Sequence, residues 1–136
     1  MREKLILTAA AALLAATVAV GQTAIKKPTS GVSYSRDIQP IFDENCAACH
    51  QTGSAEQGLV LAGDKAFQGI VRVPSKESKL DLVSPGQPDQ SYLLAKLAGT
   101  QVKVGGHGAQ MPLGDPISPA KVQLVRSWIA AGAPRN

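Results

Sequence analysis

Tyr34–His50, YSRDIQPIFDENCAACH, is the stretch that decides the fold of this chain and the chemistry it can carry. Its first part has apolar side chains at the three- and four-residue spacing of one helix face: Ile38, Ile41 and Phe42. Pro40 falls in the first turn of such a helix, where its missing N–H would have no partner in any case. We therefore predict a helix from about Asp37 toward the cysteines.

The second part of the stretch, Cys46-Ala47-Ala48-Cys49-His50, concentrates the reactive side chains. The chain has two cysteines and two histidines, and three of these four residues lie here. The spacing is the C-x-x-C-H signature typical of covalent c-type haem attachment. Two thiols about one helical turn apart can reach both vinyl groups of one porphyrin, while the neighbouring imidazole reaches the iron. We expect one haem c bound covalently by Cys46 and Cys49, with His50 as the proximal iron ligand.

Three other interpretations of the same residues are open. A thioredoxin-like C-x-x-C pair would need a βαβ setting, which the sequence lacks, and would leave His50 without a role. A disulfide between Cys46 and Cys49 would close too short a loop to stabilise the chain much. A zinc site could use both cysteines, His50 and His107, although two ligands adjacent in sequence fit poorly into a compact tetrahedral site.

Met111 is the leading candidate for a sixth iron ligand. It lies in Gln110-Met111-Pro112, and the chain's other methionine is Met1. A thioether ligand favours reduced iron and raises the potential, as suits an electron carrier. His107 is the alternative and would give a bis-His site of lower potential. The plainer roles are a methionine that fills a gap and a solvent-exposed imidazole.

The rest of the chain predicts further helices separated by long loops. A short helix is expected at 65–71, and another from Pro88 to a stop at Gly99. The last helix has Ser118 as its N-cap, Pro119 in its first turn and Gly132 at its end. Its apolar face would consist of Leu124, Val125, Trp128 and Ile129. Because no segment alternates with period two, we predict an all-α domain.

Residues 1–21 have the layout of a secretory signal peptide, with a short basic head and an apolar run. The expected cut lies before Gln22, and an uncleaved membrane anchor is the alternative. Residues 22–33 would then be a flexible leader and residues 34–136 the folded domain. The expected location is periplasmic or exported, with membrane attachment only if the segment is retained.

The charge pattern argues against nucleic acid as a partner. The formal net charge is +4 at pH 7, and the sequence has no dense Lys or Arg cluster. Scattered lysines could instead steer acidic redox partner proteins toward the domain: Lys76, Lys79, Lys96 and Lys103.

The chain resembles the class I monohaem cytochromes c from about Tyr34 to Pro134. The motifs that carry the resemblance are DIQPIF at 37–42, NCAACH at 45–50, GLVL at 58–61, PGQP at 85–88, SYL at 91–93, MP at 111–112 and WIAAGA at 128–133. The resemblance implies a small cytochrome c fold, with a few helices and long loops around one covalent haem. It also implies crossing terminal helices, with Phe42 and Trp128 near the crossing, and His50 and Met111 as axial ligands.

The expected function is therefore that of a periplasmic one-electron carrier with His/Met ligation, and not of an enzyme. The alternative is a haem enzyme or gas-binding sensor with an open or labile sixth position. That function would follow if the Met111 loop moved away from the iron, with the Gly-rich stretch 105–108 as the hinge.

Overall fold

The computed structural model describes residues 31–136, so the expected signal peptide and most of the leader at 22–33 lie outside the described residues. Four α-helices follow one another: α1 (Gln39–Asn45), α2 (Lys65–Ile70), α3 (Tyr92–Leu97) and α4 (Pro119–Ala130). Four shorter helical turns accompany them: η1 (Tyr34–Ile38), η2 (Glu56–Gly58), η3 (Pro88–Gln90) and η4 (Gln101–Val104). Within 31–136, extended backbone pairs only at isolated bridges, so the prediction of a mainly helical domain is confirmed. None of the described helices is both long and apolar enough to cross a membrane.

The predicted helix before the cysteines is confirmed, but it begins earlier, at Tyr34, with the π-helical turn η1. Ser33 caps this turn, since its hydroxyl accepts from the Arg36 N–H and its own N–H donates to Asp37 Oδ2 at 2.8 Å. Pro40 lies in the first turn of α1, as expected. The apolar face is buried at every predicted position: Ile38, Ile41 and Phe42.

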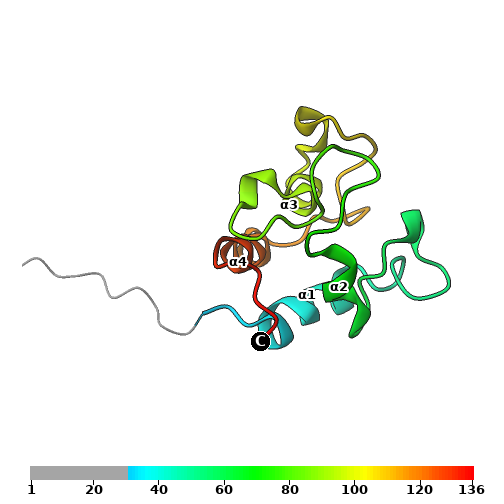
Figure 1. Ribbon diagram of the computed structural model, residues 1–136. Helices are drawn as coiled ribbons and strands as arrows, with labels where there is room; N and C mark the ends of the chain where they lie inside the picture. The colour runs from blue at the N-terminus through cyan, green and yellow to red at the C-terminus, as the bar shows by residue number, and fades with distance from the viewer. Residues whose placement is uncertain (1–30) are drawn as a thin grey trace, which may run out of the picture.

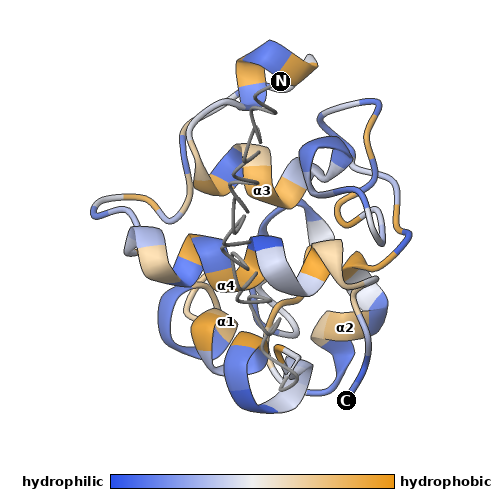
Figure 2. Cartoon of the chain, turned by 90° about the vertical axis from the view of Figure 1, so that its left-hand side faces the viewer, coloured by the Kyte–Doolittle hydropathy of each residue, from blue (hydrophilic) through white to orange (hydrophobic). Residues whose placement is uncertain are grey.

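Helix α4 is the structural centre of the domain. It lies between α3 on one side and η1 with α1 on the other, as both views show (Figures 1 and 2). Ser118 Oγ accepts from the Lys121 N–H, and Gly132 ends the helix at φ +98°, so the predicted caps are confirmed. Three of the four predicted face residues are fully buried: Val125, Trp128 and Ile129. The prediction for Leu124 is wrong: its side chain is 39% exposed, because it lies at the solvent edge of the apolar stripe.

The core between these elements is built on aromatic side chains. The Tyr34 ring lies 5.0 Å from Phe67 and 5.4 Å from Trp128, measured between centroids. Phe42 and Trp128 both belong to the buried cluster, and Trp128 Nε1 donates to the Pro134 carbonyl at 2.9 Å. The hydropathy view shows apolar segments of α1, α3 and α4 interleaved with hydrophilic ones (Figure 2). These rings pack among a larger set of buried aliphatic side chains, and burial of the whole cluster stabilises the domain.

In the middle of the chain, the helix predicted at 65–71 is confirmed as α2, but the helix predicted from Pro88 to Gly99 needs a correction. The predicted helix from Pro88 is divided, because Ser91 is extended (φ −107°, ψ 114°) between η3 and α3. Ser91 is 1% exposed, and its hydroxyl accepts from the Ser84 N–H and donates to the Gln87 carbonyl, both at 2.9 Å. These two hydrogen bonds stabilise the extended backbone at Ser91 that separates η3 from α3. The expected stop at Gly99 is confirmed by its φ of +68°.

Candidate functional site

The C-x-x-C-H residues form one further turn at the end of α1. Cys46 N–H donates to the Phe42 carbonyl at 2.8 Å, and the N–H groups of Cys49 and His50 donate to the Cys46 carbonyl at 3.1 and 2.9 Å. Both cysteines are free thiols, so the disulfide that sequence reasoning left open is not formed. Cys49 is exposed, whereas burial raises the pKa of the Cys46 thiol to about 11 and keeps it protonated at neutral pH. The turn therefore presents two thiols and one imidazole within a single short segment.

The His50 imidazole is oriented by the loop that follows it. Its Nδ1 lies 2.9 Å from the Leu59 carbonyl oxygen. Because a carbonyl can only accept, this contact favours the neutral tautomer that carries its proton on Nδ1 and its lone pair on Nε2. The Leu61 N–H returns to the His50 carbonyl at 2.7 Å, which closes the loop on the turn. In residues 31–136 no hydrogen bond engages Nε2, so this nitrogen is the available ligand atom.

Met111 is half-buried and is held through its backbone. Its N–H donates to the Lys96 carbonyl at 3.1 Å, and the neighbouring Gln110 side chain donates to the Leu97 carbonyl at 2.7 Å. Both acceptors belong to α3, so the loop that carries the thioether is anchored on a helix. Leu113, two residues later, is 70% exposed, which shows that the anchoring ends at about Pro112.

His107, the alternative ligand, lies in a more exposed position. Its side chain is 72% exposed, and Nε2 lies 3.8 Å from Glu77 Oε1. In the described part of the chain, no group of three or more His, Cys, Asp or Glu side chains is arranged to hold a metal ion. His107 is therefore not brought together with Cys46, Cys49 and His50 in the four-ligand set that a zinc site would need.

The two candidate ligand segments lie on one side of the molecule. The turn after α1 and the loop before α4 both extend to the right of the view, the first below and the second above (Figure 1). Their positions follow from their anchors, since the turn continues α1 and the Met111 loop is bound to the end of α3. The helices therefore position both candidate ligand segments.

A half-buried ionic cluster beside the Met111 loop was missed from the sequence. Tyr92 Oη donates to Glu77 Oε2 at 2.7 Å, and Lys96 Nζ lies 3.0 Å from the same oxygen. Partial burial raises the pKa of Glu77, but the hydrogen bonds from Tyr92 and Lys96 outweigh it and the net pKa is lowered. Burial, followed by the bond to Glu77, raises the pKa of Tyr92 to about 12. No sequence signal places Glu77 in this cluster, because it lies 15 residues before Tyr92, whereas Tyr92 and Lys96 are neighbours on the same face of α3.

Because of this cluster, the expectation that Lys96 could steer acidic partner proteins is wrong. The Lys96 side chain is only 13% exposed and is paired with Glu77, so it is not free to steer a partner protein. Lys76 donates to the Gln57 carbonyl at 2.5 Å. Lys79 and Lys103 are exposed and keep the expected role as a prediction.

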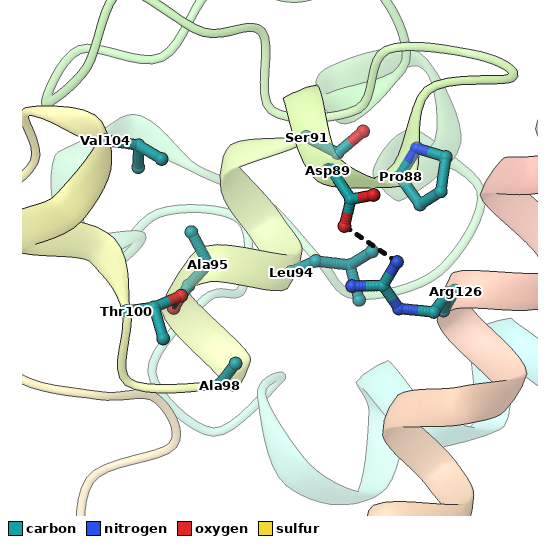
Figure 3. A pocket seen from close by; sticks show the side chains of 9 residues that line it. All are labelled: Pro88, Asp89, Ser91, Leu94, Ala95, Ala98, Thr100, Val104 and Arg126. Carbon is teal, nitrogen blue, oxygen red and sulfur yellow. Dashed lines mark hydrogen bonds and ion pairs between the residues drawn. The ribbon is translucent and has the colours of Figure 1, made fainter.

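A small hollow of about 90 Å³ lies on another part of the surface, between η3, α3 and α4 (Figure 3). An ion pair of 2.8 Å joins Arg126 to Asp89 on one side of it, and Leu94 and Ala95 are among the residues that line it. None of the candidate ligands lines this hollow. It is also far smaller than pockets for cofactor-sized ligands, so it is not the functional site.

The chain was compared with protein-family models, curated proteins and solved structures, and none of them matches it. The resemblance to class I monohaem cytochromes c accordingly stays a prediction. The Cys46–His50 turn, the Leu59 carbonyl and the anchored Met111 loop are the features from which function is argued.

Proposed function

We propose that this chain is an exported, periplasmic c-type cytochrome of the class I monohaem type, which carries single electrons between redox partner proteins. Cys46 and Cys49 would attach one haem c, and His50 Nε2 would bind its iron. The observation that carries the proposal is the Nδ1–Leu59 contact of 2.9 Å, because it leaves Nε2 available in the same turn as two free thiols. Such a hydrogen bond to the second ring nitrogen is typical of metal-binding histidines. When bound, the haem would supply reversible one-electron exchange between Fe(II) and Fe(III).

The two thiols fit covalent attachment. Each would add across one vinyl group, with sulfur bonding to one carbon and the thiol hydrogen going to the other. Cys46 is half-buried against the core and would fix one edge of the porphyrin, whereas exposed Cys49 would leave the other edge near solvent. Covalent bonds would hold the cofactor even where this small domain does not enclose it.

The Met111 loop supports a closed sixth position and hence electron transfer. The Met111 N–H bond to the Lys96 carbonyl and the Gln110 side-chain bond to the Leu97 carbonyl would hold the thioether while the iron changes oxidation state. A His50/Met111 pair would favour the reduced iron and raise the potential. Exposed Lys79 and Lys103 would attract acidic partners to the surface.

Haem staining after denaturing electrophoresis tests the attachment. The chain is produced in a host with c-type haem maturation, as wild type, as Cys46→Ser/Cys49→Ser and as His50→Ala. Wild type should keep its stain, the double variant should lose it, and His50→Ala should yield little holoprotein. Ala48→Ser, an exposed change within the same turn, is the matched control and should stain normally. A stained double variant, or an unstained wild type, would contradict the proposal.

A haem enzyme or gas-binding sensor is the alternative function. It requires the Met111 loop to leave the iron, with Gly105 (φ +78°) and Gly108 (φ +74°) as hinges. The anchors of Gln110 and Met111 on α3 oppose this movement. Addition of carbon monoxide to the reduced protein separates the two: a carrier with a closed site should show little spectral change, whereas an open site should bind the gas at once.

A further inference from the structure

Lys76-Glu77-Ser78, here called the strap, lies between the two loops that carry the candidate axial ligands. On one side, Lys76 Nζ donates to the Gln57 carbonyl at 2.5 Å. The same ammonium lies 3.1 Å from the position that a Cβ on Gly58 would occupy, so it packs directly against that turn. Gln57 and Gly58 immediately precede Leu59, the residue whose carbonyl orients His50. The first residue of the strap therefore holds the proximal loop.

The other two residues of the strap hold the loop of Met111. Glu77 Oε2 accepts from Tyr92 Oη and lies 3.0 Å from Lys96 Nζ, which in turn donates to the His107 carbonyl at 2.8 Å. Ser78 Oγ donates to the Val104 carbonyl at 2.7 Å. A Cβ at Gly106 would collide with the Tyr92 hydroxyl, so the loop backbone packs directly on that ring.

We propose that the strap positions both candidate axial ligands by joining their loops, and that Glu77 is its main positioning residue. This inference rests on the proposed function. Each ligand is close to the strap along the chain of contacts: Leu59 links Gln57 to His50, and Lys96 links Glu77 to Met111 through its backbone carbonyl. Lys76 would thus act on the His50 side of the iron, and Glu77 and Ser78 on the Met111 side.

The cluster has the burial needed to act in this way. The side chains of Glu77 and Lys96 are only 16% and 13% exposed. Removal of one partner leaves the other, half-buried charge unpaired, which costs more than loss of an exposed ion pair. The Glu44–Lys121 pair, at 2.6 Å but with side chains 64% and 35% exposed, joins α1 to α4 and offers a matched comparison outside the ligand loops.

The test uses the full chain as isolated, with Glu77→Ala, Glu77→Gln and the control Glu44→Gln. Hydrogen exchange is followed at the Met111 amide, which donates to Lys96, and at the Leu61 amide, which donates to His50. Imidazole binding to the oxidised protein reports access to the sixth position. Glu77→Ala should speed Met111 exchange and strengthen imidazole binding by about tenfold each, the factor that corresponds to one lost buried hydrogen bond. Glu77→Gln should be intermediate, because its amide oxygen can still accept from Tyr92.

Lys76→Met separates the two sides of the strap, since it should speed exchange at Leu61 and leave Met111 unchanged. The proposal is overturned if Glu77→Ala behaves as Glu44→Gln does, or if exchange rises equally in the buried part of α4. If Glu77→Ala does not fold, Ser78→Ala leaves the Glu77 cluster in place, removes the hydroxyl bonds to the Val104 carbonyl and from the Leu80 N–H, and should still speed exchange at Met111. If wild type binds no haem, the proposed function fails, but the exchange rates still decide whether the strap holds the loops.

Discussion

Two parts of this domain are held together by different forces: the part around η1, α1 and α4, here called the helical half, and the part formed by α3 and the loops bound to it, here called the loop half. Around η1, α1 and α4 the contacts are apolar, with rings of Tyr34, Phe67 and Trp128 in contact with one another. Between α3 and the loops, polar side chains bind backbone carbonyls instead: Lys76 to Gln57, Ser78 to Val104, Lys96 to His107 and Gln110 to Leu97. Apolar burial is non-directional and stabilises the fold, whereas hydrogen bonds fix where particular atoms lie.

From this difference we infer that the contacts that stabilise the fold are largely distinct from the contacts that position the candidate ligands. The candidate ligands lie on loops, but each loop is anchored on a helix, at Phe42 for the C-x-x-C-H turn and at Lys96 for Met111. Binding residues on loops that a rigid scaffold positions are common in proteins. We therefore expect changes in the helical half to lower stability and changes in the loop half to alter the iron site.

The largest effect is expected in the helical half. Trp128→Ala removes a fully buried ring from the aromatic core and should lower the free energy of unfolding by about 3–5 kcal/mol. Urea denaturation followed by circular dichroism measures the loss. Leu124→Ala on the same helix is the control, and it should cost less than about 1 kcal/mol because the side chain is 39% exposed. Equal losses in the two variants would mean that the aromatic core does not stabilise the domain as described.

Met111→Ala should act on the iron site rather than on the fold. If the sulfur binds iron, the far-red charge-transfer band of the oxidised protein should vanish while the haem stays attached. The potential should also fall by at least about 59 mV, a tenfold change for one electron, because a ligand that favours Fe(II) is lost. Redox titration measures the shift.

His107→Ala is the control for this variant, and it should leave band and potential nearly unchanged, since its side chain is 72% exposed and paired with Glu77. If His107→Ala changed the spectrum and the potential while Met111→Ala changed neither, bis-His ligation would be established. If Met111→Ala lowered the free energy of unfolding as much as Trp128→Ala does, the separation of the two halves would be contradicted.

Local signals account for the parts of the fold that could be predicted. Helices α1 and α4 follow from apolar spacing and from cap residues such as Ser118 and Gly132, all of which act within a few residues. The C-x-x-C-H turn is equally local. The break at Ser91 was missed because it depends on the Ser84 N–H, seven residues earlier in the chain.

The loop half could not be predicted, because its contacts join distant residues. Glu77 meets Tyr92, Lys96 and His107 only after the chain has folded. From the sequence, Lys96 resembled any surface lysine, and its role as a buried partner has no periodic or compositional signal. Motifs therefore identified the candidate ligands, but only the structure identified the residues that hold the Met111 loop.

Ser91→Ala sharpens the boundary between the halves. The change leaves the Ser84 N–H and the Gln87 carbonyl without their side-chain partner and should cost about 1–3 kcal/mol. Ser54→Ala, in an exposed loop, is the matched control and should be nearly neutral. Thermal unfolding measures both. A neutral Ser91→Ala would show that water replaces the hydroxyl and that the break does not need it.

The smallest effect concerns Tyr34, whose pKa is raised first by burial and then by the nearby Asp43. The pKa in the folded state exceeds the unfolded value of about 10, so the associated stability is fully present below pH 10 and is lost as pH rises above it. The loss approaches about 1.4 kcal/mol for each pH unit while only the unfolded state is ionised. Tyr34→Phe should remove this slope between about pH 10 and 11 in urea denaturation, apart from the share that Tyr92 contributes.

Tyr92→Phe is the comparison from the loop half: it should remove only its own share of the slope, and it should also loosen the strap, because the bond to Glu77 is lost. An unchanged slope in Tyr34→Phe would mean that the hydroxyl, bound to Gln39 at 2.6 Å, ionises as readily in the folded as in the unfolded chain. The aromatic core would then be open to water on that side, and the contrast between a dry helical half and a polar loop half would fail.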